Sequence, residues 1–189
     1  HPIIMENLHG IKRVNGSNQK AKKPILINDL KQIIDVIDQK NEADIKKLRN
    51  RTLLLIGFSG GFRRKELISL DVEDVEFVFE GLKLRLRRSK TDQFGEGFTK
   101  AIPHFENSIY CPVTSLKRWL NVTKIYKGPV FVRLKKGSKI TNKRLTDQSV
   151  ALIIKEYLMK AGIDNKNYSG HSLRSGFATS AAEAGAEER

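Results

Sequence analysis

A histidine and an arginine stand three residues apart in the segment SGHSLRSGFATS, which covers residues 169–180. On a helix this spacing places His171 and Arg174 on one face. The small residues that follow let such a helix pack closely against its neighbours, so we expect its polar side chains to be held in place. An arginine held in this way presents a planar pair of donors that fits a phosphate. Without its context, the pair would more often be a structural histidine beside a surface arginine.

A second cationic site is predicted in GGFRRKELISL, which begins at Gly60. Arg63 comes directly after the Gly-Gly break, at the start of a short helix, where free backbone N–H groups and the positive end of the helix favour anions. Glu66 lies three residues later on the same face and could hold Arg63 in one rotamer. The alternative is an exposed ion pair that contributes little to stability. We expect Arg64 and Lys65 to be exposed charges.

The segment RRSKTDQ is predicted to form the tip of a hairpin that carries Lys90. Because Arg87 and Arg88 precede this lysine, the tip is basic and could reach into a groove of a nucleic acid. The alternative is common: a solvated edge strand that lysines protect from pairing with other strands.

A metal-dependent nuclease would need a cluster of carboxylates. The segment DVEDVE offers four acidic residues within six positions, starting at Asp71. They alternate with valines at the entrance to a strand, so we expect them to form its solvent face rather than a metal site. The sequence also contains no phosphate-binding Walker loop, no zinc-ligand spacing and no G-x-S-x-G motif.

Helices must position the cationic residues, and hydrophobic periodicity predicts several of them. Asn28 is expected to cap a helix in which apolar residues recur at intervals of three and four. A helix over residues 45–58 is richer in apolar residues, is expected to be central, and ends at the breaker in residues 59–61. Later helices are bounded by capping signals: Pro112 at the start of one, Thr146 or Asp147 at the start and Gly162 at the end of the next, and Gly185 at the end of the last.

Between residues 75 and 102 the pattern becomes that of strands. VEFVF, the alternating LKLRLRR and GFTKAIP are separated by turn signals in Glu80–Gly81 and in TDQFGEG. Further along, GPVFVRL is expected to be one short strand or extended segment. The sequence therefore predicts an α+β fold, a helix-dominated domain with a small three-stranded antiparallel sheet.

Composition limits the class of partner. The 189 residues contain 35 Lys and Arg against 21 Asp and Glu, a formal net charge of +14. A domain this basic usually binds a polyanion, with nucleic acid as the leading candidate. No uncharged apolar stretch reaches the roughly 20 residues needed to span a bilayer, no signal peptide is visible, and the single cysteine, Cys111, cannot form an internal disulfide. We therefore expect an intracellular protein without a membrane partner.

Residues 1–23 are expected to lie outside the folded domain. They are rich in Gly, Asn, Ser and Lys, lack a hydrophobic period, and begin without Met, so the segment looks like a basic linker cut from something longer. Structure is expected to begin near Pro24 and to continue as one domain over residues 24–189.

Four stretches taken in order carry a resemblance to a known family. FSGGFRRKELISL, RRSKTD, YCPVTSLKRWL and SGHSLRSGFAT resemble the catalytic domain of the tyrosine recombinases, the phage integrase family. The resemblance covers residues 24–189, and the order and spacing of the stretches make it specific. It implies a site-specific recombinase that breaks and rejoins DNA through a 3′-phosphotyrosine, with no metal ion and no cofactor.

The resemblance also implies catalytic roles. Arg63 resembles the first catalytic arginine, Glu66 its acidic partner and Lys90 the hairpin lysine, while His171 and Arg174 match the H-x-x-R signature. The two arginines would clamp the charge that builds on the non-bridging oxygens of the phosphate. The lysine would protonate the departing 5′-oxygen, and the histidine would hydrogen-bond the phosphate or assist proton transfer.

Basic residues outside this set are expected to contact the DNA backbone. The segment RLKKGSKITNKR, from Arg133 to Arg144, contains six Lys and Arg and no acidic residue. The predicted contact residues are Arg87, Arg88, Lys135, Lys136, Lys139, Lys143 and Arg144.

One departure from the family pattern affects the chemistry. The family's nucleophilic tyrosine lies well downstream of H-x-x-R, whereas all four tyrosines here, Tyr110, Tyr126, Tyr157 and Tyr168, precede His171. The family's N-terminal core-binding domain is not seen either. We therefore expect a catalytic domain truncated at its C-terminal end, which by itself would be inactive.

The expected partner is double-stranded DNA, and the full-length recombinase would assemble with other protomers into a tetrameric synapse. The fragment alone is expected to be a monomer. A bacterial or phage-encoded protein acting on DNA in the cytoplasm is expected from the resemblance. The alternative is a non-catalytic DNA-binding module or regulator that retains the recombinase fold, while a DNA-relaxing topoisomerase is disfavoured by YCPVTSLKRWL.

Overall fold

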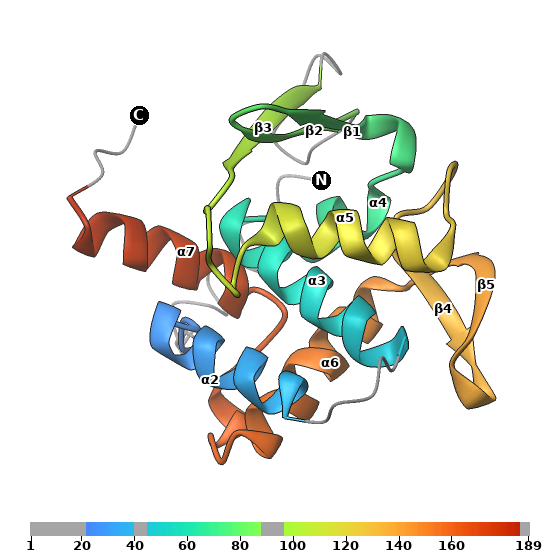
Figure 1. Cartoon of the computed structure of the whole chain (residues 1–189). Coiled ribbons are helices and arrows are strands. Elements are labelled where there is room, and N and C mark those ends of the chain that lie inside the picture. Colours follow the sequence, from blue (N-terminus) through green and yellow to red (C-terminus); the bar gives the residue numbers. More distant parts are fainter. Residues whose placement is uncertain (1–21, 40–44, 88–96, 186–189) are drawn as a thin grey trace, which may run out of the picture.

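The computed structural model describes residues 22–39, 45–87 and 97–185 (Figure 1). Within them, helices dominate and the strands form two small antiparallel sheets. The helices are α2 (Ile27–Asp38), α3 (Ile45–Ser59), α4 (Arg64–Ser69), α5 (Pro112–Thr123), α6 (Asp147–Lys160) and α7 (Ser172–Glu183), with short 3₁₀ turns at Val72–Asp74, Lys136–Ser138 and Asn165–Asn167. The strands are β1 (Val75–Val78), β2 (Gly81–Leu86), β3 (Phe98–Pro103), β4 (Val132–Lys135) and β5 (Lys139–Arg144).

Helix α3 lies at the centre of the domain, as its composition predicts. Every residue from Thr52 to Phe58 is buried, because α2, α4, α5 and α7 all pack against this helix. A helix that is apolar on all sides has no solvent-facing stripe and must be enclosed by others. The Gly-Gly turn and Arg63 follow the carboxyl end of α3. The packing of α3 in the core therefore fixes the position of that arginine.

Helix α2 has the predicted buried face, but its start differs from the prediction. Its residues at intervals of three and four, from Leu30 to Ile37, are buried. The N-cap is Leu26 rather than Asn28, and the carboxylate of Asp29 accepts the N–H of Leu26 at 3.2 Å. The expectation that Asn28 caps the helix is therefore wrong, because a carboxylate one residue later already satisfies the free backbone donor.

The other capping predictions are confirmed. Pro112 occupies the first turn of α5, and Thr146 caps α6, its hydroxyl accepting the N–H of Ser149 at 3.3 Å. Gly162 and Gly185 follow α6 and α7 with φ of 74° and 80°, a conformation that glycine adopts without strain.

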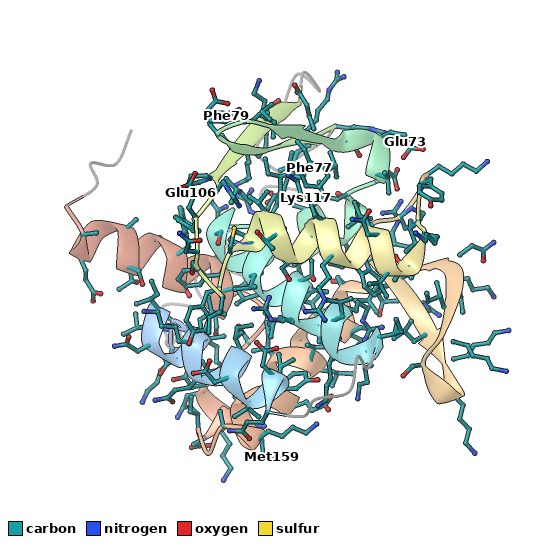
Figure 2. All side chains as sticks on the ribbon, viewed as in Figure 1. Glu73, Phe77, Phe79, Glu106, Lys117 and Met159 are labelled. Carbon is teal, nitrogen blue, oxygen red and sulfur yellow. The ribbon has the colours of Figure 1, made fainter. Side chains whose placement is uncertain are left out.

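The predicted three-stranded sheet is present in the order β1-β2-β3, with both neighbouring pairs antiparallel. Its inner face carries Leu82, Leu84 and Leu86, which are fully buried, and it lies over α5 in Figure 1. At its edge, the ammonium of Lys117 on α5 lies 5.3 Å from the centre of the Phe77 ring on β1, so the two labelled side chains meet between sheet and helix (Figure 2). The sheet is therefore anchored to the helical body along one face.

A second hairpin, β4–β5, was only half predicted. The segment GPVFVRL does contain a strand, but it begins at Val132 because Val130 and Phe131 enter the core first. The basic stretch after it pairs back as β5, through a turn in which Gly137 and Ser138 have positive φ. The hairpin projects from the side of the molecule opposite α7 (Figure 1).

The expectation that the acidic segment DVEDVE forms the solvent face of a strand is correct only for Glu76, which is exposed on β1. Residues 72–74 form a 3₁₀ turn, and Asp74 is buried. Asp74 accepts the Nε–H of Arg87 at 2.7 Å, and Glu73 accepts the N–H of Gly128 at 3.0 Å. These carboxylates therefore join β2 and the segment before β4 to the end of α4.

Candidate active site

The predicted site is organised around the Gly60–Gly61 turn that ends α3. The N–H of Gly61 donates to the carbonyl of Phe58 at 2.9 Å, and Gly61 has φ of 54°. A Cβ added to Gly61 would lie 2.8 Å from the ring of Phe177 on α7. A side chain is therefore excluded here on two grounds, the backbone conformation and the close approach of α7.

Arg63 is fixed by Glu66 in the way the sequence predicts. The buried carboxylate of Glu66 accepts the N–H of Arg63 at 2.9 Å and its Nη1–H at 2.7 Å. The side chain of Arg63 remains 29% exposed. One acidic group therefore caps α4 and orients a guanidinium that still reaches solvent.

Arg174 reaches the same turn from the other end of the sequence. Its Nη1 donates to the carbonyl of Gly61 at 2.8 Å, across 113 positions of the chain. Among the described residues its Nε and Nη2 donate no hydrogen bond, and the residue is exposed. The fork of Arg174 is thus anchored at one nitrogen and open to solvent at the others.

Close packing holds α7 in the position that this bond requires. The N–H of Ile25 donates to the carbonyl of Ser172 at 2.9 Å, and a Cβ added to Gly176 would lie only 1.8 Å from the carbonyl oxygen of Ile25. The expectation of close packing is therefore correct for the start of the helix, where Gly176 makes the contact, but not for Ala178 and Ala182, which are exposed.

His171 lies at the N-cap of α7, one helical turn before Arg174. It is exposed, and its N–H donates to the hydroxyl of Ser169 at 3.2 Å. A Cβ added to Gly170 would lie 1.9 Å from Cδ of Arg64, so Arg64 crosses directly over the backbone beside His171. Arg64 is partly buried rather than an exposed charge, whereas Lys65 is exposed as expected.

Lys100, which is not among the predicted site residues, belongs to the same cluster. Its Nζ donates to the carbonyl of Gly60 at 2.6 Å. Burial lowers the pKa of Lys100, the positive charges of Arg174 and Arg63 lower it further, and Glu66 partly offsets them. A signal was present: the alternation in FTKAIP places Lys100 on the same strand face as the buried Ile102.

The structure brings Arg63, Glu66 and Arg174 together at one turn, with His171 on the same helix as Arg174. Lys90 and Arg88 lie outside the described residues. The roles of both residues stay predictions.

Two of the predicted DNA contacts have intramolecular partners. Arg87 pairs with Asp74, as described above, and lies 3.8 Å from Asp71. Arg144 is bound to Asp71 and donates to the carbonyls of Ile68 at 2.6 Å and Leu70 at 3.2 Å. These bonds give both arginines a role in joining the two sheets to α4.

The other predicted contacts, which we call the hairpin lysines, are exposed on the β4–β5 hairpin. They lie on the opposite side of the molecule from α7 in Figure 1. The structure therefore does not gather them with Arg63 and Arg174 at the Gly60–Gly61 turn, which we call the arginine cluster. The hairpin lysines are Lys135, Lys136, Lys139 and Lys143.

Residues 22–39, 45–87 and 97–185 contain no group of three or more His, Cys, Asp or Glu side chains that could hold a metal ion. Within the same ranges, none of the helices has the length and apolar character needed to cross a membrane.

The sequence profile of the phage integrase family matches residues 25–189. An integrase/recombinase xerD homolog of Selenomonas ruminantium is 40% identical over 181 residues, which cover 96% of this chain and 52% of that protein. The chain spans about half the length of the curated relatives it matches.

Solved structures with the same fold include a XerH site-specific recombinase in a post-cleavage complex with a palindromic difH substrate. The TM-score is 0.68 at 19% identity, over 89% of this chain and 44% of that one. A lambda integrase tetramer bound to a Holliday junction matches with a TM-score of 0.57 at 14% identity, over 88% and 45% of the two chains. At these identities the likeness concerns the fold, and it confirms the predicted helix-dominated α+β class.

Proposed function

The chain belongs to the phage integrase family, and from this premise we propose that residues 24–189 form the DNA-cleaving domain of a site-specific tyrosine recombinase. The observation that carries the proposal is the meeting of Arg63 and Arg174 at the Gly60–Gly61 turn. Two guanidinium groups far apart in sequence, each held by a hydrogen bond and each partly accessible to solvent, are suited to hold one phosphate between them. Residues 1–23 are proposed to link this domain to a DNA-binding part of the whole protein.

In the proposed reaction a tyrosine oxygen attacks the scissile phosphorus, the bond to the 5′-oxygen breaks, and a 3′-phosphotyrosine forms. Arg63 and Arg174 stabilise the negative charge that develops on the non-bridging oxygens. Glu66 and the carbonyl of Gly61 fix these arginines in advance, so little reorganisation is needed in the transition state.

The remaining proton transfers are assigned to two other residues. Lys90 is proposed to donate a proton to the departing 5′-oxygen. His171, exposed at the start of α7, is proposed to hydrogen-bond the same phosphate or to assist the removal of the proton that the attacking tyrosine hydroxyl loses. Strand rejoining is the reverse attack by a 5′-hydroxyl on the phosphotyrosine, with the same groups in reversed roles.

The attacking tyrosine is proposed to come from outside residues 1–189. Tyr157 is buried in the core, where its hydroxyl accepts a hydrogen bond from Asn50 at 3.3 Å. The hydroxyl of Tyr110 donates to Asp35 at 2.8 Å, which raises the pKa of this phenol and makes it a poorer nucleophile at neutral pH. Both tyrosines therefore have structural partners of their own.

Double-stranded DNA is the proposed substrate, bound through the arginine cluster and the hairpin lysines. The related XerH structure contains its difH substrate, and the lambda integrase structure is a tetramer on a Holliday junction. By analogy, we propose that the complete protein assembles with other protomers on DNA and that residues 1–189 alone are monomeric. A site of action in the cytoplasm follows from the same proposal.

The test uses a pool of nicked duplexes with randomised sequence around the nick, so that many candidate target sequences are presented at once. The pool is incubated with residues 1–189, with the complete product of the gene, and with the complete product carrying Arg174→Ala. SDS-stable protein–DNA adducts are then counted on a denaturing gel.

We expect an adduct with the complete product and none with residues 1–189. Arg174→Ala should slow adduct formation by about 10²–10³-fold, the usual effect of losing one group that stabilises an oxyanion. If the complete product binds DNA but forms no adduct above the Arg174→Ala control, the alternative of a non-catalytic DNA-binding module or regulator replaces the recombinase.

A further inference from the structure

Lys100 occupies a position that a strand normally gives to an apolar residue. In the register of β2 and β3, Lys100 lies opposite Leu84, which is fully buried. Side chains that face each other across an antiparallel pair point to the same side of the sheet, so Lys100 points to the core side. A methionine or leucine here would fill the space without an ion to desolvate.

The contacts of Lys100 show what the ammonium does there. Its Nζ donates to the carbonyl of Gly60 at 2.6 Å, and it lies 5.1 Å from the centre of the Phe62 ring and 5.6 Å from that of Phe98. Two aromatic faces and one carbonyl thus partly replace its hydration. The side chain is held in one place rather than extended into solvent.

Lys100 and Arg174 bind successive carbonyls of one turn. Lys100 donates to the carbonyl of Gly60, and Arg174 donates to the carbonyl of Gly61. Arg63 lies two residues after Gly61 in the sequence. Three cations are therefore gathered with one carboxylate, Glu66. Burial lowers the pKa of Lys100 most, and repulsion from the two arginines lowers it further. Like charges gathered in this way disfavour the free protein but favour a bound anion.

We propose that Lys100 is a positioning residue of the arginine cluster, fixing the Gly60–Gly61 turn from strand β3 so that Arg63 and Arg174 face the same phosphate. This inference rests on the proposed function. It adds that β3, as well as α4 and α7, holds the site together. It also adds a coupling between anion binding and the protonation of Lys100.

The coupling has a defined sign. A bound dianion offsets the repulsion from Arg174 of α7 and from Arg63 at the start of α4, so it raises the pKa of Lys100 back toward its ordinary value. Glu66 of α4 acts in the same direction but is present in both states. Since the anion prefers protonated Lys100, its affinity must fall as pH rises through the lowered pKa of this lysine.

The experiment titrates sulfate into the 189-residue chain at constant ionic strength, between pH 7 and pH 10. Sulfate remains a dianion over this range, so any change of affinity with pH belongs to the protein. Binding is followed by the ¹³Cζ shifts of Arg63 and Arg174, and the ¹³Cε shift of Lys100 reports its own protonation. The variants are Lys100→Met, Lys100→Arg and Lys83→Met, the last a matched loss of charge on the outer face of the same sheet.

For the wild type we expect affinity to fall with pH in step with the titration of Lys100. Lys100→Met should bind sulfate about tenfold more weakly at pH 7, and its affinity should show no such step. Lys100→Arg should bind within about threefold of the wild type without the step, since guanidinium stays protonated throughout. Lys83→Met should bind within about twofold of the wild type.

Two results overturn the proposal: Lys100→Met binding as tightly as the wild type, or the pH step persisting in Lys100→Arg. Either would leave the proposed function standing. If sulfate causes no saturable shift at the wild-type arginines, the phosphate site of the proposed function fails as well. Should Lys100→Met not fold, the comparison of Lys100→Arg with the wild type still decides the question through the pH step.

Discussion

Replacing Gly176 with alanine should displace helix α7 from the body of the protein. The added Cβ would lie 1.8 Å from the carbonyl oxygen of Ile25 and 2.7 Å from its carbonyl carbon. Ordinary contacts begin near 3.4 Å, so the helix must withdraw by about 1.6 Å. The obstacle is backbone, which cannot rotate away as the end of a side chain could.

The magnitude follows from three effects. Overpacking of this kind costs about 1–3 kcal/mol. Loss of the hydrogen bond from Ile25 to Ser172 adds about 0.5–1.5 kcal/mol, while alanine in a helix gains back about 1 kcal/mol over glycine. We expect a net loss of about 2 kcal/mol, which lowers Tm by about 4–8 °C in a domain of this size.

Displacement of α7 should also break the bond from Arg174 to Gly61 and weaken sulfate binding at the arginine cluster. The assays are urea unfolding and the sulfate titration described above. Ser180→Ala is the matched control, because it changes a small residue of the same helix whose buried hydroxyl has no partner among the described residues. Its stability should stay within about 0.5 kcal/mol of the wild type.

A Gly176→Ala variant as stable as the wild type, or more stable, would contradict the close contact between α7 and Ile25. Such a result would mean that the higher helix propensity of alanine is the main effect of the substitution on stability. Helix α7 could then not lie as close to the backbone of Ile25 as described. An unstable variant that retained full sulfate affinity would refute the second part, the dependence of the arginine cluster on the position of α7.

Three further predictions concern the cap, the hairpin and the pH dependence of stability. Glu66→Ala should lower the free energy of unfolding by about 1–2 kcal/mol, since Arg63 loses the acceptor of its N–H and of its guanidinium; an unchanged urea midpoint would contradict this. Replacing all four hairpin lysines with glutamine should weaken the salt dependence of duplex DNA binding. The slope of the logarithm of the association constant against the logarithm of salt concentration should become shallower by about 0.9 for each lost phosphate contact. An unchanged slope would exclude the hairpin from the DNA-binding surface. Because the pKa of Lys100 is lowered in the folded state, its charge opposes folding at neutral pH, and this opposition disappears as pH rises toward the pKa of the unfolded state. The stability of the wild type relative to Lys100→Met should therefore rise between about pH 8 and pH 10.5. A difference in stability that stays constant over this range would contradict the burial of a charged Lys100.

The sequence predicts most of the fold because local rules act where the elements begin and end. The apolar residues of α2 repeat at helical intervals, and α3 is recognised by its continuous apolar run. Pro112, Thr146 and Gly162 each satisfy a backbone requirement that depends on near neighbours. The β5 strand was missed because its residues are mostly exposed lysines and polar side chains. Only its pairing with β4 makes it a strand, and pairing is not a local property.

The candidate site is predictable in part for the same reason. Glu66 lies within one helical turn of Arg63, so their bond can be read from spacing. The bond from Arg174 to Gly61 depends on how α7 packs, and the approach of Lys100 depends on the register of β3 with β2. These relations arise from tertiary packing, which spacing along the chain does not determine. The pairing of Arg144 with Asp71 was missed for the same reason.

The central claim is that Arg63 and Arg174 bind one phosphate of duplex DNA. It is tested most directly by following the ¹³Cζ shifts of both arginines while a short nicked duplex is added to the chain at low salt. We expect both signals to shift along a single binding curve with one dissociation constant, and we expect Arg174→Ala to abolish the shift of Arg63 at the same DNA concentrations. Saturation of the hairpin lysine signals while both arginine signals stay unchanged would contradict it.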